Sequence, residues 1–325
     1  MGDILVIGSM NVDMTIRVKE LPKTGETILA GNLSFGLGGK GANQAMAAAR
    51  LGGKVRMLGC VGDDDFGRKH TQALREAGVD VSDIKTDRAA STGSAFICVE
   101  ENGGNCIVVS QGANLSCDED YIKSKREVIR SAGIVLVQME IPQKALYSAI
   151  LDARAVRGKV ILNPAPAPEH IPDEIYRGLD YLTPNETELM KLCGMEGEVS
   201  GGTWDGQAIQ EGARRLLEKG VGTVIVTLGE KGCGVFRKGH VAWFPAKRVR
   251  AVDTTAAGDC FNAALAVALA EGRTEQEAVE FAICASGIAV TRAGAQESLP
   301  YRREVEAREE TLPFRAMAQR FKEEQ

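Results

Sequence analysis

The chain has 325 residues, a net charge of −5 and 44% hydrophobic residues, which is enough apolar content for a single large α/β unit with a sizeable core. It has no run of Lys and Arg, and no apolar run approaches the roughly 18 residues of a membrane helix, so neither nucleic acid nor a membrane is an expected partner. The eight cysteines form no C-x-x-C pair, and we expect reduced thiols in a cytoplasmic protein.

Short apolar runs alternate with helical periodicity along the chain. Residues 4–7 read as a buried strand, and further strands are expected at 55–61, 134–137, 160–162, 181–182 and 223–228. Helical periodicity covers residues 42–51, 67–77, 145–156 and 208–219. This alternation predicts an α/β fold with a mostly parallel central sheet flanked by helices, in which ligands bind beyond the C-terminal ends of the strands.

We interpret residues 1–325 as one domain. Two regions of this domain interrupt the alternation of strands and helices. Extended pieces at 15–18 and 26–30 surround a turn, and pieces at 94–99 and 105–110 flank Glu-Asn-Gly-Gly, a hairpin signal. They predict a small separate sheet, inserted at about 14–36 and 93–111, which needs a partner surface for stability. A lid over the site, packed on the main domain or on a second subunit, meets that need, and surface hairpins without function are the alternative. We expect a surface loop at 197–205 and an exposed helix after residue 302.

An amide and a carboxylate follow the first strand, in Gly8-Ser-Met-Asn11-Val-Asp13. Because Asn11 and Asp13 are two residues apart, they project on the same side of an extended segment. Such a pair can hold vicinal hydroxyls of a polyhydroxylated ligand, although a polar turn is an equally simple interpretation.

A glycine-rich stretch, Gly36-Leu-Gly-Gly39-Lys40-Gly-Ala-Asn43-Gln44, precedes the first long helix. Its glycines match G-x-G-x-x-G, so a dinucleotide site is one hypothesis, with Asp63 near the position of the expected acid. Against it, the preceding residues belong to the extra sheet and not to a βαβ unit. The stretch is not a Walker A loop, because Lys40 is followed by Gly41.

The segment Thr183-Pro-Asn185-Glu186-Thr-Glu188 predicts a helix start, with Thr183 and Glu186 as a capping box and Pro184 at the first helical position. Asn185 and Glu188 then share a face and are free to hold water around Mg²⁺. Thr227 and Gly229, at the end of a strand, resemble a nucleotide-facing loop.

The most informative motif is Asp253-Thr-Thr255-Ala256-Ala257-Gly258-Asp259, which runs into a long apolar segment. Small residues at a helix start leave backbone N–H groups available for an anion such as phosphate. A carboxylate next to that site can accept a proton from an attacking hydroxyl, so the motif indicates phosphoryl transfer. A capped buried helix without function is the alternative.

In combination, these motifs, with Asn163-Pro-Ala-Pro-Ala and the turn-rich segment at 289–298, resemble the ribokinase branch of the PfkB carbohydrate-kinase family up to about residue 303. The resemblance implies a ribokinase-like fold with a β-sheet lid that often serves as a dimer contact, so we expect a homodimer. It also implies ATP-dependent phosphorylation of D-ribose at O5, with Asp259 as general base.

The same resemblance assigns roles to individual residues. The backbone of Ala256, Ala257 and Gly258 is expected to form the anion hole. Ribose is expected to contact Asn11, Asp13, Gly39, Lys40, Asn43, Glu140 and Asp259. ATP and Mg²⁺ are expected at Asn185, Glu188, Thr227, Gly229 and Gly258, and an activating K⁺ at Asp253, Thr255, Ala289, Arg292, Gly294 and Ser298.

Three alternatives to a ribose kinase stay open from sequence. One is a kinase for 2-deoxyribose, fructose or adenosine; another is a dinucleotide-dependent oxidoreductase; the third is a non-catalytic sugar sensor. Asn11 together with Asp13 favours a sugar that has both ring hydroxyls, because a site built to bond a hydroxyl rejects an analogue without it.

Overall fold

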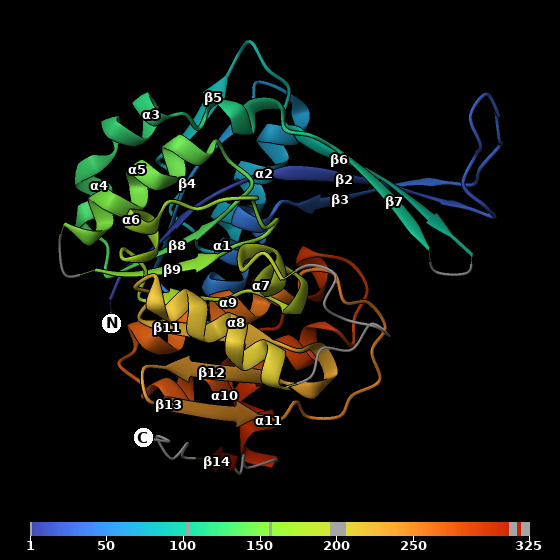
Figure 1. Ribbon diagram of the computed structural model, residues 1–325. Helices are drawn as coiled ribbons and strands as arrows, with labels where there is room; N and C mark the ends of the chain where they lie inside the picture. Colours follow the sequence, from blue (N-terminus) through green and yellow to red (C-terminus); the bar gives the residue numbers. More distant parts are fainter. Residues whose placement is uncertain (1, 102–103, 156–157, 196–205, 312–316, 320–325) are drawn as a thin grey trace.

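The computed structural model describes residues 2–101, 104–155, 158–195, 206–311 and 317–319. The loop expected at 197–205 lies outside these residues. Within them the strands form two sheets, a large one in the body of the molecule and a small one that projects from it (Figure 1).

The large sheet has ten strands in the described part of the chain, in the order β14-β13-β12-β11-β10-β9-β8-β1-β4-β5. These are β1 Ile4–Ile7, β4 Val55–Gly62, β5 Ile84–Asp87, β8 Ile134–Gln138, β9 Lys159–Asn163, β10 Tyr181–Leu182, β11 Thr223–Thr227, β12 Cys233–Arg237, β13 His240–Phe244 and β14 Met317–Gln319. The strands from β5 to β11 pair in parallel, and β12, β13 and β14 add antiparallel pairs at one edge. The predicted mostly parallel α/β sheet is therefore confirmed.

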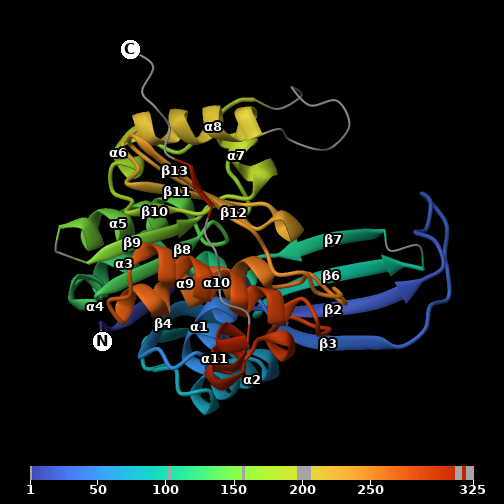
Figure 2. The ribbon, with the colours of Figure 1, turned by 90° about the horizontal axis from the view of Figure 1, so that it is seen from below.

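Helices cover both faces of the large sheet (Figure 2). On one face lie α1 Lys40–Arg50, α2 Asp65–Glu76, α9 Ala257–Ala270, α10 Glu275–Ala289 and α11 Arg302–Thr311. On the other lie α3 Glu119–Ser124, α4 Arg126–Ser131, α5 Gln143–Arg154, α6 Asp173–Tyr176, α7 Glu186–Leu192 and α8 Gly206–Glu218. The short 3-10 helices are η1 Gly112–Ser116, η2 Gly229–Lys231 and η3 Gln296–Ser298.

Strand β1 shows why the sheet needs helices on both sides. It lies between β4 and β8, and all four of its residues are buried. Ile4 and Val6 pack into the core that contains α1 and α9, whereas Leu5 and Ile7 pack into the core on the opposite face. Because side chains alternate between the two faces of a strand, β1 contributes residues to two separate hydrophobic cores.

The small sheet has the order β3-β2-β6-β7, with β2 Asn11–Val18, β3 Leu33–Gly38, β6 Gly93–Glu100 and β7 Asn105–Ser110. The expectation of a strand at 26–30 is wrong. Strand β2 begins at Asn11, and its antiparallel register pairs Asn11 with Gly38 and Asp13 with Gly36. Because of this register, the partner strand is formed by residues 33–38. Residues 26–30 instead lie in the loop between β2 and β3.

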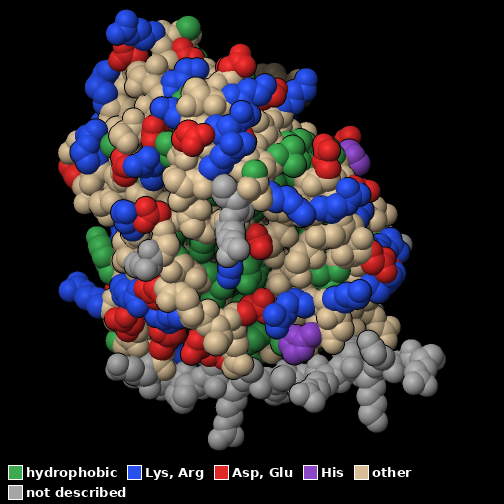
Figure 3. All heavy atoms as spheres, turned by 90° about the vertical axis from the view of Figure 1, so that its left-hand side faces the viewer, with side chains coloured by type: hydrophobic (Ala, Val, Ile, Leu, Met, Phe, Trp, Pro, Cys, Tyr) green, Lys and Arg blue, Asp and Glu red, His purple; other side chains and the backbone are tan. Residues whose placement is uncertain are grey.

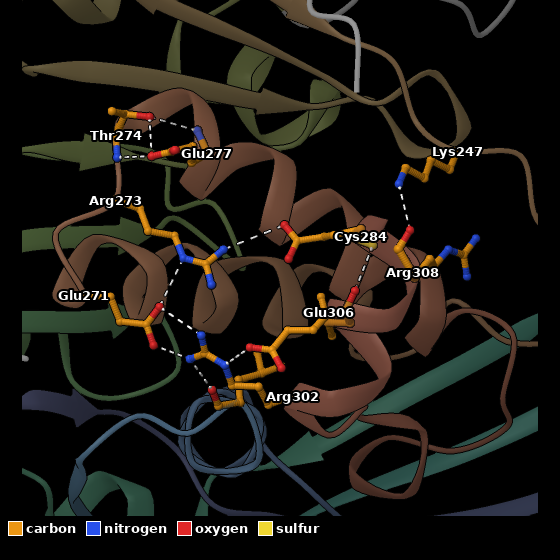
Figure 4. Close-up of polar contacts among 12 residues, drawn as sticks. Lys247, Glu271, Arg273, Thr274, Glu277, Cys284, Arg302, Glu306 and Arg308 are labelled. Carbon is orange, nitrogen blue, oxygen red and sulfur yellow. Dashed lines mark hydrogen bonds and ion pairs between the residues drawn. The ribbon is translucent and has the colours of Figure 1, made fainter. Parts of the chain in front are cut away.

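Ion pairs fasten the C-terminal helix to the body (Figure 4). Arg302, the first residue of α11, donates to Glu271 at the end of α9, to Glu306 at 2.7 Å and to the Leu51 carbonyl at 3.3 Å. Arg273 also donates to Glu271, at 3.1 Å, and its guanidinium lies 4.5 Å from the centre of the Phe281 ring. These contacts join α9, α10 and α11 around one aromatic side chain.

On the face drawn in Figure 3, Lys and Arg side chains lie among Asp and Glu side chains. Among the described residues, no helix is both long and apolar enough to cross a lipid bilayer.

Candidate active site

The carboxylate of Asp259 is buried at the start of α9, with 5% of the residue exposed. The first long helix supplies donors to both of its oxygens: Asn43 Nδ2 donates to Oδ2 at 3.0 Å, and Gln44 Nε2 donates to Oδ1 at 2.9 Å. Two amide donors therefore fix the orientation of this acid, as required of a group that accepts a proton from a defined direction.

The backbone at the start of α9 is unusual. Ala256, its N-cap, has a φ of +59°, and it is the one non-glycine residue with positive φ in the described part of the chain. An alanine in the left-handed region costs on the order of 1–2 kcal/mol, and such strain is typical of functional sites. In front of Gly258 there is open space, since a Cβ built there has no neighbour within 4 Å.

The expected anion hole fits this helix start only in part. Within the described residues, the N–H groups of Ala256 and Gly258 donate to no protein acceptor. The N–H of Ala257 is different, because it donates to the Thr254 carbonyl at 3.2 Å, where it closes the turn before the helix. Of the predicted trio, Ala256 and Gly258 are thus the two residues whose N–H groups are open to a ligand.

Asn11 and Asp13 both lie in β2, near the point where the small sheet joins the body, and not in a polar turn. The Asp13 carboxylate packs against Gly38, where a Cβ would come within 2.3 Å of its Oδ2. Burial, together with the nearby carboxylates of Glu140, Glu297 and Asp259, raises the pKa of Asp13 to about 6. Asp13 and the predicted base Asp259 therefore lie close enough for their charges to interact.

Gly39 lies against the backbone of Asn11, and Lys40 follows it as the first residue of α1. Gly39 has a φ of +85°, and a Cβ there would meet the backbone nitrogen of Asn11 at 2.6 Å, so glycine is required for this close approach. The backbone N–H of Lys40 donates to Glu140 Oε2 at 3.1 Å, and the Ser9 hydroxyl donates to the same oxygen. Burial opposes the charge of Lys40, but the carboxylates of Asp259, Glu140 and Glu188 together raise its pKa.

The segment around α7 departs from its predicted cap. Asn185, and not Thr183, is the N-cap, and its side chain forms a capping box with Glu188. The extended pairing of β10 continues past Pro184, whose carbonyl accepts the Thr227 N–H, and Asn185 forms a bridge with Thr227, so the helix cannot begin earlier. The Thr183 hydroxyl instead donates to Asn262 Oδ1 at 2.6 Å.

This arrangement brings the predicted nucleotide-facing residues together. Asn185 and Thr227 are bridge partners, and Gly229 begins η2 two residues later with a φ of +54° and open space around it. Burial raises the pKa of Glu188, and Asp259 adds to this effect while Lys40 and the Asn185 N–H oppose it. Among the described residues no group of three His, Cys, Asp or Glu side chains could hold a metal ion by itself.

The residues predicted for K⁺ lie on two adjoining turns. Asp253 Oδ1 accepts from the N–H and hydroxyl of Thr255 at 2.9 and 2.7 Å, and Asp253 Oδ2 accepts from the Gly294 N–H at 3.0 Å. Hydrogen bonds from Thr255 and Gly294 outweigh burial and lower the pKa of Asp253. The Arg292 N–H donates to the Ala289 carbonyl at 3.0 Å. Ser298 is buried in η3, and its hydroxyl donates to the Ala295 carbonyl.

Sequence analysis did not predict a chain of buried side-chain amides that leads to Asp259. Gln138 Nε2, at the end of β8, donates to Gln44 Oε1 at 2.6 Å, and Gln44 Nε2 donates onward to Asp259 and to Asn163 Oδ1. Gln44 and Asn163 lie within two of the sequence motifs, whereas Gln138 lies in none of them. The signal was a polar residue directly after a run of apolar residues at the end of a strand, as at Gln138 in β8 and Asn163 in β9.

A buried oriented carboxylate, a helix start with open N–H groups, and an amide–acid pair at the strand ends define a group-transfer enzyme for a small polar substrate. The chain belongs to the pfkB family of carbohydrate kinases, whose family model matches residues 1–302. The predictions of the family and of an ATP-dependent sugar kinase are therefore confirmed.

Individual relatives agree with this assignment. The chain is 40% identical over 311 residues to a ribokinase of Haemophilus influenzae, covering 96% of this chain and 97% of the relative. It is 37% identical over 298 residues to a deoxyribokinase of Salmonella typhi, covering 92% and 95%. The solved structure of Arabidopsis thaliana ribokinase complexed with ribose and ATP superimposes with a TM-score of 0.86 at 34% identity, covering 94% of this chain and 98% of that one.

The dinucleotide hypothesis is wrong for the glycine-rich stretch. Gly36 and Gly38 lie in β3, which pairs antiparallel with β2 in the small sheet, and no parallel strand leads into α1. A dinucleotide fingerprint requires a parallel strand before the glycine turn.

Proposed function

We propose that this protein transfers the γ-phosphoryl group of ATP to O5 of D-ribose. The observation that carries the proposal is geometric: Gly39 lies against the backbone of Asn11, and Asn43 and Gln44, one turn further along α1, donate to both oxygens of Asp259. A sugar held by its ring hydroxyls at Asn11 and Asp13 therefore lies close to the proposed base. The ribokinase relatives support ribose as the acceptor.

In the proposed reaction, Asp259 accepts the proton of the O5 hydroxyl as O5 attacks the γ-phosphorus. The new O5–P bond forms while the bond between the γ-phosphorus and the bridging oxygen breaks, so ADP leaves with that electron pair. The N–H groups of Ala256 and Gly258, at the positive end of the α9 dipole, stabilise the charge on the transferred group. Lys40 remains protonated among three carboxylates and balances part of their charge.

The remaining proposed sugar contacts come from Gly39, Asn43 and Glu140. Asn43 Oδ1 is buried without a protein partner, which leaves it able to accept a sugar hydroxyl. Glu140 is oriented by Ser9 and the Lys40 N–H, and its second oxygen is available to the ligand.

Two ions belong to the proposal. Mg²⁺ would neutralise charge on the phosphates of ATP, and Asn185 and Glu188 would hold it through water, because an amide and an acid can both accept hydrogen bonds from its hydration shell. K⁺ would be held by carbonyls of the turns at Asp253, Thr255, Ala289, Arg292, Gly294 and Ser298. Because Asp253 links these turns to the start of α9, a cation there would order the anion hole.

We further propose a homodimer in which the small sheet acts as a lid and a subunit contact. Strand β7 exposes Ile107, Val108 and Val109, each more than half exposed, and Phe35 and Phe96 are equally open. A single-layer sheet with apolar side chains on both faces gains stability when a second layer covers it. The proposed location is the cytoplasm, supported by eight cysteines that are all free thiols.

The test is a coupled assay of ADP production from Mg·ATP with D-ribose, 2-deoxyribose, fructose or adenosine, each in K⁺ or Na⁺. Ribose as the preferred acceptor, with higher turnover in K⁺, is the expected result. Preference for 2-deoxyribose would transfer the proposal to the activity named for the Salmonella relative. Ribose binding without ADP release would instead indicate a sugar sensor.

A further inference from the structure

The side chain of Asn11 is held by a second asparagine from a distant part of the chain. Asn114, in η1, donates from Nδ2 to Asn11 Oδ1 at 2.7 Å, and only 1% of Asn114 and 5% of Asn11 is exposed. A hydrogen bond between two buried amides fixes both of them, because any misplaced donor or acceptor would lose its partner.

The orientation of Asn114 is set by the backbone. The Met10 N–H, which can only donate, lies 2.9 Å from Asn114 Oδ1, and Asn114 Nδ2 also lies 3.3 Å from the Met10 carbonyl. The Nδ2 group of Asn114 must therefore face Asn11, and Asn11 must present its oxygen in return. The Nδ2 group of Asn11 donates to no described residue and stays available for a ligand.

Two further contacts hold this arrangement. Gly93 is the register partner of Asn11 in β6, and a Cβ there would lie 2.3 Å from both Asn11 Oδ1 and Asn114 Nδ2. His70 is fully buried and lies with Nε2 2.7 Å from the Asn11 carbonyl, so Nε2 carries the proton and donates. Burial lowers the pKa of His70 to about 4, which keeps the ring neutral at physiological pH.

We propose that Asn114 is a positioning residue for sugar specificity, which holds the Asn11 amide with its NH₂ group toward the substrate. Asn11 then acts as a donor next to Asp13, an acceptor when ionised. One hydroxyl of a vicinal pair accepts from Asn11 while its neighbour donates to Asp13. A sugar without one of these hydroxyls leaves a buried group unpaired, which is a strong basis for discrimination. The inference rests on the proposed function, in which Asn11 and Asp13 hold the sugar.

The central test is Asn114→Asp, assayed near pH 8 by calorimetric binding of ribose and by steady-state kinetics. The introduced carboxylate still accepts the Met10 N–H but faces the Asn11 oxygen with an acceptor, so the Asn11 amide rotates. We expect the ribose Kd to rise about 10- to 100-fold and the ribose to 2-deoxyribose ratio of kcat/KM to fall about tenfold. The kcat at saturating ribose should change less than about threefold, because the base is untouched.

Two variants separate positioning from damage to the fold. Asn114→Ala frees the Asn11 amide without reversing it, and should give a smaller loss of discrimination. Ser116→Ala removes the hydrogen bond from the same 3-10 helix to Asp87 and should lower Tm without changing the ribose to 2-deoxyribose ratio. An unchanged ratio in both Asn114 variants would overturn the inference, as would an equal fall in the Ser116 variant.

Asn11→Ala distinguishes the failure of this inference from failure of the proposed site. If Asn11→Ala leaves the ribose Kd unchanged, the assignment of the sugar site itself is wrong. If it weakens ribose binding while the Asn114 variants do not, only the role of Asn114 is wrong. In the Asn11→Ala background, Asn114→Asp should cause no further loss of discrimination.

Discussion

Asp259 is defined by what surrounds it, not by its position in a motif alone. A lone acid in the first turn of a helix is common, because it stabilises the helix dipole. Here the acid is buried and accepts hydrogen bonds from Asn43 and Gln44 on a helix more than 200 residues earlier in the chain. This degree of orientation is more than a helix cap requires, and it supports the proposed role of Asp259 as a base.

Replacement of the proposed base by Asp259→Ala should lower kcat about 10²- to 10⁴-fold, because proton transfer from O5 loses its acceptor. The coupled ADP assay at saturating substrates measures this change, and calorimetry checks that ATP still binds. Turnover near that of the unmodified enzyme would remove Asp259 from the mechanism.

The buried carboxyl of Asp13 makes stability depend on pH. Its folded pKa, about 6, lies above the ordinary value of an unfolded aspartate, so the folded chain holds this proton more tightly. The contribution of Asp13 to stability is present at low pH and is lost as the pH rises through about 6. Asp13→Asn should therefore stabilise the ligand-free protein by up to about 3 kcal/mol near pH 8 and by clearly less near pH 5.

Urea unfolding at the two pH values measures this difference. Glu20→Gln, at an exposed position on the loop after β2, is the control for removal of a surface carboxylate. A stabilisation by Asp13→Asn that is the same at both pH values would contradict the prediction.

At the scale of elements, the sequence predicted what repeats locally. Alternation of apolar runs and helical periodicity predicted the parallel sheet, and the buried strand expected at residues 4–7 is β1, which lies between β8 and β4. The second strand of the small sheet was misplaced because a strand's register is set by its partner, and Asn11 pairs with Gly38 across a long loop. The sequence did not predict the roles of Asn114, Gln44 and Gln138 for a related reason. Their hydrogen-bond partners are roughly 90 to 220 residues away, and no local pattern in the sequence identifies them.

The junction of β3 and α1 depends on a glycine for two separate reasons. Gly39 combines a φ of +85° with a close approach to Asn11, whereas Gly25 has nearly the same φ, +84°, in open space. Gly25→Ala should cost only the backbone strain, about 1–2 kcal/mol. Gly39→Ala should cost more than about 3 kcal/mol and raise the KM for the sugar, because α1 and β2 must separate.

Thermal unfolding and sugar kinetics of the two variants test this comparison. Equal losses of stability would show that the backbone angle alone matters and that the contact between Gly39 and Asn11 is not tight.

At the scale of the whole molecule, the small sheet projects from the body (Figure 2). Several of its apolar side chains are exposed. Val108 and Val109 are neighbours in β7, so they point to opposite faces of this sheet, and both are more than half exposed. The double variant Val108→Glu, Val109→Glu should be monomeric in light scattering, because a charge cannot be buried unpaired in a subunit contact. The two single variants identify which face forms the contact.

The control variant needs an exposed apolar side chain outside the small sheet. Leu151 on α5 is exposed and meets this requirement, whereas Val128 packs against the core. Leu151→Glu introduces the same charge far from the small sheet and should leave the subunit number unchanged. If the double variant stays dimeric, the subunit contact does not involve the small sheet.

The pairing of α1 with α9 also has a consequence during synthesis. The buried face of α1, formed largely by Ala42, Ala45, Met46 and Ala48, is covered by a helix that ends at Ala270. At ribosomal rates this leaves an apolar helix face uncovered for on the order of 10 to 40 s in every nascent chain. Until α9 emerges, the apolar face of α1 is open to chaperones, and any product that terminates before α9 contains Asn43 and Gln44 but lacks Asp259, to which they donate.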